Sequence, residues 1–189
     1  MFEVDKQIFL WINGLAGRSA VADYIIQGIA NDYFVIVSFC LGLLAIWFGS
    51  TSKEMQKAVI AAVISIGLAS LLVVLSNHFY FRPRPFTELP TTLLFYKPGD
   101  SSFPSNMATV LMAISIPIFW TNKKIGGLFI GVSIIASLAR VYIGIHYPFD
   151  IMGGFILALA AAVAAIYILK ILGKYVDLFL KMLQKVCLA

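Results

Sequence analysis

Long apolar segments limit most strongly how this chain can fold. Five of them approach or exceed the roughly 20 residues that a helix needs to cross the hydrocarbon core of a bilayer. They lie at about residues 31–50, 57–79, 104–121, 124–143 and 148–171. Of the 189 residues, 61% are hydrophobic and only 12% are charged, which leaves too little polar surface for a water-soluble protein. The chain is therefore predicted to be an all-α, polytopic transmembrane helix bundle that forms one domain over residues 1–189.

Both ends of the chain are predicted to lie along the membrane surface. Residues 2–16 place Trp11 and other apolar side chains on one helical face and Asp5 on the other. A second short helix is expected over residues 20–30, and an amphipathic tail over residues 172–188. Residues 2–30 could alternatively form a sixth crossing, so five to six membrane helices are expected.

Several other features bound the class of protein. The first thirty residues lack the basic start and cleavage site of a signal peptide, so the chain is expected to be mature. Cys40 falls in a span and Cys187 in the tail, which makes a disulfide framework unexpected. The net charge of +5 is interpreted as membrane topology and not as nucleic-acid binding, because no basic stripe with interleaved aromatic residues is present.

Lysine and arginine are predicted to lie on opposite sides of the membrane. The positive-inside rule makes the lysine-rich side cytoplasmic, and it holds Lys53, Lys57, Lys123, Lys124, Lys170, Lys174, Lys181 and Lys185. The other side holds all four arginines, which are Arg18, Arg82, Arg84 and Arg140. Arginine suits bidentate recognition of phosphate or carboxylate. The sequence therefore indicates an active site on the extracytoplasmic side.

Two polar clusters precede the third span. Arg82 and Arg84 alternate with prolines that stiffen the backbone and present both guanidinium groups. The plain alternative is a basic loop that reaches lipid headgroups. Residues 101–109 contain serines and Pro104 ahead of an apolar run, a pattern typical of a helix N-cap and first turn. The free N–H groups of such a turn suit an anion, although an ordinary helix cap gives the same pattern.

A third cluster joins the fourth and fifth spans. Arg140 ends the fourth span, and Pro148 suits the first turn of the fifth. His146 and Asp150 are four residues apart, so they can share a helix face. Asp150 could then accept a hydrogen bond from one imidazole nitrogen and leave the other free as a nucleophile. The alternative is a buried His–Asp pair that only ties two helices together.

Taken together, the three clusters predict a site for a phosphate ester. The chemistry expected there is transfer of a phosphoryl group to His146 and then to water. No group of histidines, cysteines or carboxylates has metal-ligand spacing, so no metal or other cofactor is expected. The arginines would instead stabilise the charge that develops during the reaction.

These motifs resemble the type 2 phosphatidic acid phosphatase superfamily, and within it the short bacterial undecaprenyl-pyrophosphate phosphatases. The family pattern is Lys-x6-Arg-Pro, then Pro-Ser-Gly/Asn/Asp-His, then Ser-Arg-x5-His-x3-Asp, and the similarity covers essentially the whole chain. The resemblance implies that His146 is the nucleophile and that Asp150 orients it. It also implies that phosphate is bound by Arg84, Ser105, the backbone N–H of Asn106, Arg140 and the additional Arg82.

The chain departs from the family pattern at three positions. Asn77 replaces the lysine of the first motif, and Ala139 replaces the serine of the third. Met107 stands where the family has a second histidine, the expected general acid. Methionine cannot donate a proton, and general acid–base help is typically worth about 10²–10⁴-fold in rate. A diphosphate needs that proton less than a monoester, because its leaving group is a phosphate. Met107 therefore favours a diphosphate substrate, an impaired enzyme or an introduced substitution.

The sequence as a whole predicts a lipid phosphatase that removes the terminal phosphate of a polyprenyl diphosphate such as undecaprenyl pyrophosphate. Its lipid substrate would enter from the bilayer of a bacterial plasma membrane. One alternative is a phosphatase for phosphatidylglycerol phosphate, phosphatidic acid or a lipid A phosphate. Another is a lipid-phosphate binder or transporter without catalytic activity. The sequence carries no signal for the oligomeric state.

Overall fold

The computed structural model describes residues 2–185, and this part of the chain is helical with no strand. Its helices in chain order are α1 (Phe2–Asn13), α2 (Ala20–Ile29), α3 (Asp32–Gly49), α4 (Lys53–Phe79), α5 (Pro85–Glu88), α6 (Asn106–Thr121), α7 (Lys123–Tyr142), α8 (Pro148–Ile171) and α9 (Gly173–Lys185). The predicted all-α fold is confirmed.

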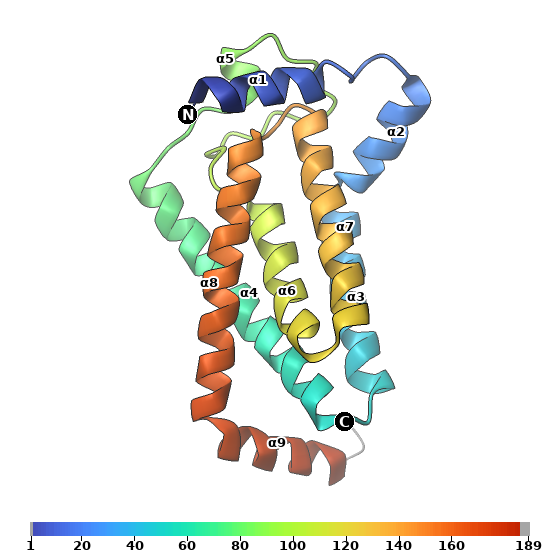
Figure 1. Cartoon of the computed structure of the whole chain (residues 1–189), viewed down its shortest axis with the longest axis vertical. Helices are drawn as coiled ribbons and strands as arrows, with labels where there is room; N and C mark the ends of the chain where they lie inside the picture. Colours follow the sequence, from blue (N-terminus) through green and yellow to red (C-terminus); the bar gives the residue numbers. More distant parts are fainter. Residues whose placement is uncertain (1, 186–189) are drawn as a thin grey trace.

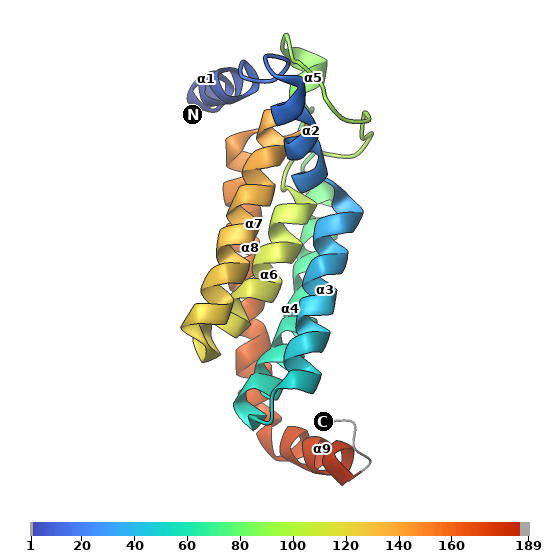
Figure 2. The ribbon, with the colours of Figure 1, turned by 90° about the vertical axis from the view of Figure 1, so that its right-hand side faces the viewer.

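Five helices, α3, α4, α6, α7 and α8, run lengthwise and form the bundle (Figures 1 and 2). All of these except α6 are long and apolar enough to cross a membrane. Their bounds lie close to the predicted spans. The largest difference is at α4, which begins at Lys53 instead of residue 57.

Helix α6 is the shortest of the five, with 16 residues, and it packs against α4, α7 and α8. Its buried side chains Leu111, Ile114 and Ile118 belong to a core that also includes residues of α3 and α4. Because protein surrounds α6 on several sides, it can carry buried hydroxyl groups that hydrogen-bond to neighbours. Ser115 does so, since its Oγ lies 2.9 Å from that of Ser133 on α7. This contact ties the middle of α6 to α7 inside the bundle.

Helix α1 lies across one end of the bundle, which we call the α1 end (Figure 1). Residues 2–29 thus form two short helices instead of a sixth crossing. Asp5, predicted on the face of α1 opposite the apolar side chains, is fully buried together with Phe9, whereas Trp11 is 74% exposed. The burial of the Asp5 charge is compensated by hydrogen bonds from Arg82 and from the backbone N–H of Phe149.

Helix α9 lies across the opposite end of the bundle, the α9 end (Figure 1). It matches most of the predicted amphipathic tail, whereas residues 186–188, with Cys187, lie outside the described part of the chain. The ammonium group of Lys57 lies 2.9 Å from the Asp177 carboxylate and links α4 to α9.

Candidate active site

The predicted site residues meet at a cavity of about 380 Å³ at the α1 end. Six of them line it, namely Asn77, Arg84, Asn106, Met107, Arg140 and His146. Ser105 lies between two lining residues, Pro104 and Asn106. The remaining two, Arg82 and Asp150, are buried but are not among the lining residues.

A tight turn after α7 connects Arg140 to His146. The backbone N–H of Gly144 donates to the Val141 carbonyl at 3.1 Å, and that of Ile145 donates to the Arg140 carbonyl at 3.2 Å. Gly144 has φ +90°, and a Cβ added there would lie 2.5 Å from the Thr91 side chain. Only glycine fits this backbone conformation and this space without strain.

His146 is 2% exposed and has distinct partners for its two ring nitrogens. Nδ1 lies 2.9 Å from the carbonyl oxygen of Ser102, and Nε2 lies 3.4 Å from a guanidinium nitrogen of Arg84. A carbonyl can only accept and a guanidinium can only donate, so the proton is assigned to Nδ1 and the lone pair to Nε2. Burial lowers the pKa of His146 to about 4, and the charges of Arg140 and Arg84 act in the same direction. The imidazole is therefore neutral near pH 7, and its Nε2 lone pair faces the guanidinium group of Arg84.

Asp150 orients this histidine less directly than expected. Its Oδ2 lies 3.7 Å from Nδ1 of His146, beyond hydrogen-bond distance. The same oxygen accepts from the Ser102 hydroxyl at 2.5 Å and from the backbone N–H of Tyr147 at 2.8 Å. Asp150 thus fixes Ser102, whose carbonyl in turn contacts the imidazole. The predicted His–Asp hydrogen bond is replaced by this relay.

Arg82, predicted to bind phosphate, does not line the cavity and is bound to two carboxylates instead. Its guanidinium nitrogens lie 2.6 Å from an oxygen of Asp150 and 2.5 Å from an oxygen of Asp5. Its Cζ lies 4.0 Å from the centre of the Tyr147 ring. All these groups are buried at the back of the site. Arg82 therefore connects α1 to the start of α8, because two buried carboxylates share its positive charge.

The two arginines of the cavity are each paired with a carboxylate. Arg84 lies 2.7 Å from Asp100, and Arg140 lies 2.5 Å from Asp32. Neither aspartate belongs to a motif, so reasoning from the sequence missed both. Asp32 lies more than one hundred residues before Arg140 in the chain, and only the fold brings the two together. The sequence offered one signal for Asp100, namely that it is a charged residue in the same loop as Arg84.

The N-terminus of α6 faces this cavity. Ser105 is its N-cap, but the hydroxyl does not cap the helix, and the buried Oγ has no hydrogen-bond partner among the described residues. Helix α8 approaches closely at Gly154, where an added Cβ would lie 3.0 Å from the Ser105 carbonyl. The first N–H groups of α6 lack intrahelical acceptors and, with the Ser105 hydroxyl, suit an anion.

The two most important departures from the family pattern lie in the same cavity. Asn77 lies in the last turn of α4 and lines the cavity, and its buried Oδ1 has no partner among the described residues. Met107 is 2% exposed, and its sulfur accepts a hydrogen bond from Arg140 at 3.4 Å. Met107 thus lies beside a phosphate-binding candidate, but it has no proton to transfer.

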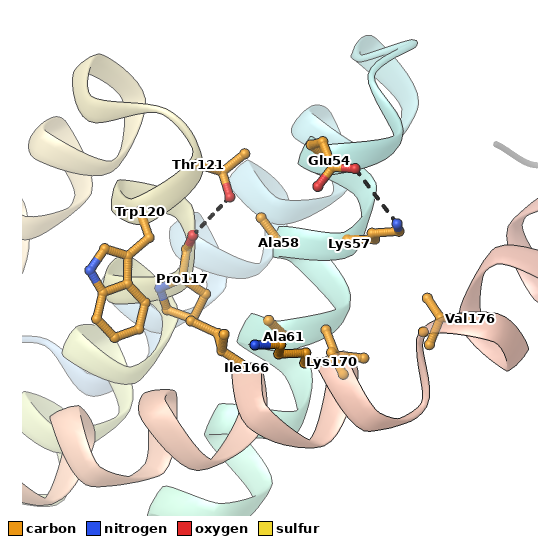
Figure 3. Close-up of a pocket in the computed structure, with 12 residues that line it drawn as sticks. Glu54, Lys57, Ala58, Ala61, Pro117, Trp120, Thr121, Ile166, Lys170 and Val176 are labelled. Atoms are coloured by element: carbon orange, nitrogen blue, oxygen red, sulfur yellow. Dashed lines mark hydrogen bonds and ion pairs between the residues drawn. The ribbon is translucent and has the colours of Figure 1, made fainter.

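A second cavity, of about 470 Å³, lies at the α9 end between α4, α6, α8 and α9 (Figure 3). Its lining combines Trp120 and small apolar side chains with Lys57, Lys170 and Glu54. Figure 3 shows the ion pair between Lys57 and Glu54, which lie 3.6 Å apart. The lining contains no histidine, cysteine or arginine, so the chemistry described above belongs to the α1 end.

Over residues 2–185, no group of three or more histidines, cysteines and carboxylates is arranged to hold a metal ion. The charged groups that line the cavity are instead two arginines, each paired with an aspartate. His146 also lines the cavity and is neutral. An anion is the ligand that this arrangement and the α6 N-terminus suit best.

Comparisons with known proteins agree with the fold and the motifs. Undecaprenyl-diphosphatase BcrC of Bacillus subtilis (strain 168) is 34% identical over 185 residues, which cover 97% of this chain and 93% of that protein. The crystal structure of Aquifex aeolicus LpxE has a TM-score of 0.71 at 22% identity, over 85% of this chain and 93% of that one. A PAP2-type phosphatidylglycerolphosphate phosphatase from Bacillus subtilis has a TM-score of 0.63 at 19% identity, over 86% and 83%. The PAP2 superfamily model matches residues 58–174, more than half of the chain, and the chain therefore belongs to the PAP2 superfamily.

Proposed function

We propose that this protein removes the terminal phosphate of a polyprenyl diphosphate through a phosphohistidine formed at His146. The observation that carries the proposal is the meeting of Arg84, Arg140 and a neutral His146 at one cavity. Two buried donors at this site, Arg140 Nε and Ser105 Oγ, have no partner among the described residues. Unpaired buried donors are costly, and a phosphoryl group would satisfy both.

The first half of the reaction would form a bond between Nε2 of His146 and the terminal phosphorus. The bond from that phosphorus to the bridging oxygen breaks, and its electron pair leaves with the lipid monophosphate. The backbone N–H groups of α6, with Arg84 and Arg140, would stabilise the charge on the transferred group. Water then hydrolyses the phosphohistidine and releases inorganic phosphate.

A lipid substrate is supported by the apolar walls next to the polar site. Ile36 of α3 and Val73 and Val74 of α4 line the same cavity as His146. A separate groove of about 520 Å³ begins at Cys40, one helical turn from Ile36 on α3, and at Ile66, one turn from the cavity-lining Ser70 on α4. Apolar side chains line this groove almost throughout, including Trp47 and Phe48. The apolar lining of this groove suits a hydrocarbon tail whose phosphate end lies in the site cavity.

The choice of a diphosphate rests on Met107. Because no proton donor stands at this position, the leaving group has to depart with little acid catalysis. A phosphate leaves as a weak base, whereas the alkoxide of a monoester does not. Undecaprenyl diphosphate, the substrate in the name of BcrC of Bacillus subtilis, is a diphosphate and so has a phosphate as its leaving group.

We place the α1 end on the extracytoplasmic side of a bacterial plasma membrane. The arginines of the site lie at this end, whereas α4 and α7 begin with lysines at the α9 end. The positive-inside rule assigns the lysine-rich end to the cytoplasm. Lys6 and Lys97 also lie at the α1 end, but they do not outnumber the lysines of the other end.

The test is release of inorganic phosphate from undecaprenyl diphosphate by the purified protein in detergent, with and without a chelator. We expect turnover in both conditions and none from the His146→Asn variant. The Met107→His variant is the matched comparison, and it should accelerate monoester hydrolysis more than diphosphate hydrolysis. An inactive wild type beside an active Met107→His variant would refute catalytic competence. A preference for phosphatidic acid or phosphatidylglycerol phosphate would refute the diphosphate assignment.

A further inference from the structure

Asp32 lies at the active-site cavity although it belongs to none of the sequence motifs. It is the first residue of α3, and its side chain lines the cavity with 28% of its surface exposed. Oδ1 lies 2.5 Å from Nη1 of Arg140, and Oδ2 accepts from the Tyr96 hydroxyl at 3.3 Å. Arg140 and Tyr96 thus hold one carboxylate oxygen each and fix the position of the Asp32 side chain.

Arg140 can bind a phosphoryl group without releasing Asp32. Its Nη1 contacts Asp32, the Ala30 carbonyl and the sulfur of Met107. Its Nε is buried and has no partner among the described residues. A guanidinium group has five N–H donors in a fixed plane, so different edges can serve two anions. A phosphoryl group bound by Nε would therefore share the Arg140 guanidinium group with the Asp32 carboxylate, which contacts Nη1.

The second half of the proposed reaction requires a group that accepts a proton from water. Attack in line means that water approaches the phosphorus from the side opposite Nε2 of His146. Arg84, with its partner Asp100, contacts His146 itself and so lies on the nucleophile's side. Asp32 instead contacts Nη1 of Arg140. The same nitrogen contacts the sulfur of Met107, the position at which the family pattern has a histidine. Asp100 is moreover 63% exposed, more than twice as much as Asp32.

We propose that Asp32 is the general base that activates water for hydrolysis of the phosphohistidine, a role that rests on the proposed function. The water oxygen bonds to phosphorus, and the bond from phosphorus to Nε2 breaks with its electron pair returning to the imidazole. The proton of the water passes to the Asp32 carboxylate. The products are inorganic phosphate, a neutral histidine and a protonated Asp32, which then gives its proton to solvent. Tyr96 is a positioning residue that holds the carboxylate through Oδ2.

The test follows both half-reactions with undecaprenyl diphosphate labelled in its terminal phosphate. In Asp32→Asn we expect one equivalent of undecaprenyl phosphate to form in a rapid burst while labelled phosphohistidine accumulates. Release of inorganic phosphate should then be slower by about 10²–10⁴-fold, the usual worth of a general base. The double variant Asp32→Asn and Met107→His should recover part of that rate, because the imidazole introduced at position 107 would lie beside Nη1 of Arg140 and could accept the proton. Asp177→Asn at the α9 end is the matched control and should behave like the wild type.

Three results would overturn the role of Asp32. One is an Asp32→Asn variant that hydrolyses its phosphohistidine at the wild-type rate. Another is an equal loss in both half-reactions, which would mean that Asp32 only holds Arg140. Because Asp32→Asn could unfold the site, Asp32→Glu is measured as well, and hydrolysis no faster than in Asp32→Asn would also count against the proposal. A wild type that forms no phosphohistidine would instead refute the proposed function itself.

Discussion

Nδ1 of His146 lies 2.9 Å from the carbonyl oxygen of Ser102. This contact decides which nitrogen of the imidazole carries the proton, and it leaves the Nε2 lone pair facing the side of Arg84. Asp150 acts through Ser102, whose hydroxyl it holds at 2.5 Å. The imidazole of His146, the proposed nucleophile, is therefore oriented by the Ser102 carbonyl, and Asp150 acts on it only through Ser102.

The first prediction concerns the protonation of His146. Since its folded-state pKa of about 4 lies below the ordinary value of 6.5, the unfolded chain binds more protons between these two pH values. The contribution to stability is thus fully present above pH 6.5 and is lost as the pH falls toward 4. Nitrogen-15 NMR of the His78→Gln variant, which retains His146 as its single histidine, should show a neutral ring with the proton on Nδ1 down to about pH 5. A ring that becomes charged near pH 6.5 would contradict the buried site.

The second prediction separates the two arginines of the first motif. Arg82→Gln leaves the buried carboxylates of Asp5 and Asp150 without their shared cation, so the free energy of unfolding should fall by about 3–5 kcal/mol. Arg84→Gln should lose less stability, because its partner Asp100 is largely exposed. Thermal unfolding in detergent measures both changes. Weaker inhibition by inorganic phosphate is expected mainly for Arg84→Gln, and a stable Arg82→Gln that binds phosphate poorly would make Arg82 a ligand after all.

The third prediction concerns the turn that carries His146. Gly144→Ala places a Cβ at positive φ and 2.5 Å from Thr91, which should cost about 1–2 kcal/mol from the backbone alone. The turn must shift, so we expect a loss of both thermal stability and phosphate release. Gly131→Ala, in the middle of α7 with open space around it, is the control and should lower neither thermal stability nor phosphate release. Equal behaviour of the two variants would show that the turn tolerates movement.

The positions of the membrane helices along the chain could be predicted from the sequence, because hydrocarbon thickness and apolar composition fix where a chain can cross a membrane. The spacing of Arg140, His146 and Asp150 was the basis for predicting His146 as a nucleophile, and this role stays a prediction. The structure places the three residues at the end of α7, in the following turn and at the start of α8. By contrast, Asp5 and Asp32 come from the N-terminal part of the chain and reach their arginines only through folding. No local periodicity reports such contacts. For the same reason, Arg82 could not be distinguished from Arg84, although one binds carboxylates at the back and the other lines the cavity.

The most direct test of the central claim is to identify the residue that carries the phosphoryl group. The wild-type protein is mixed with undecaprenyl diphosphate labelled in its terminal phosphate, quenched with base within one turnover and mapped by mass spectrometry. We predict label on His146, released as inorganic phosphate in a chase, and no label in His146→Asn. Label on any other residue, or undiminished phosphate release by His146→Asn, would contradict the account.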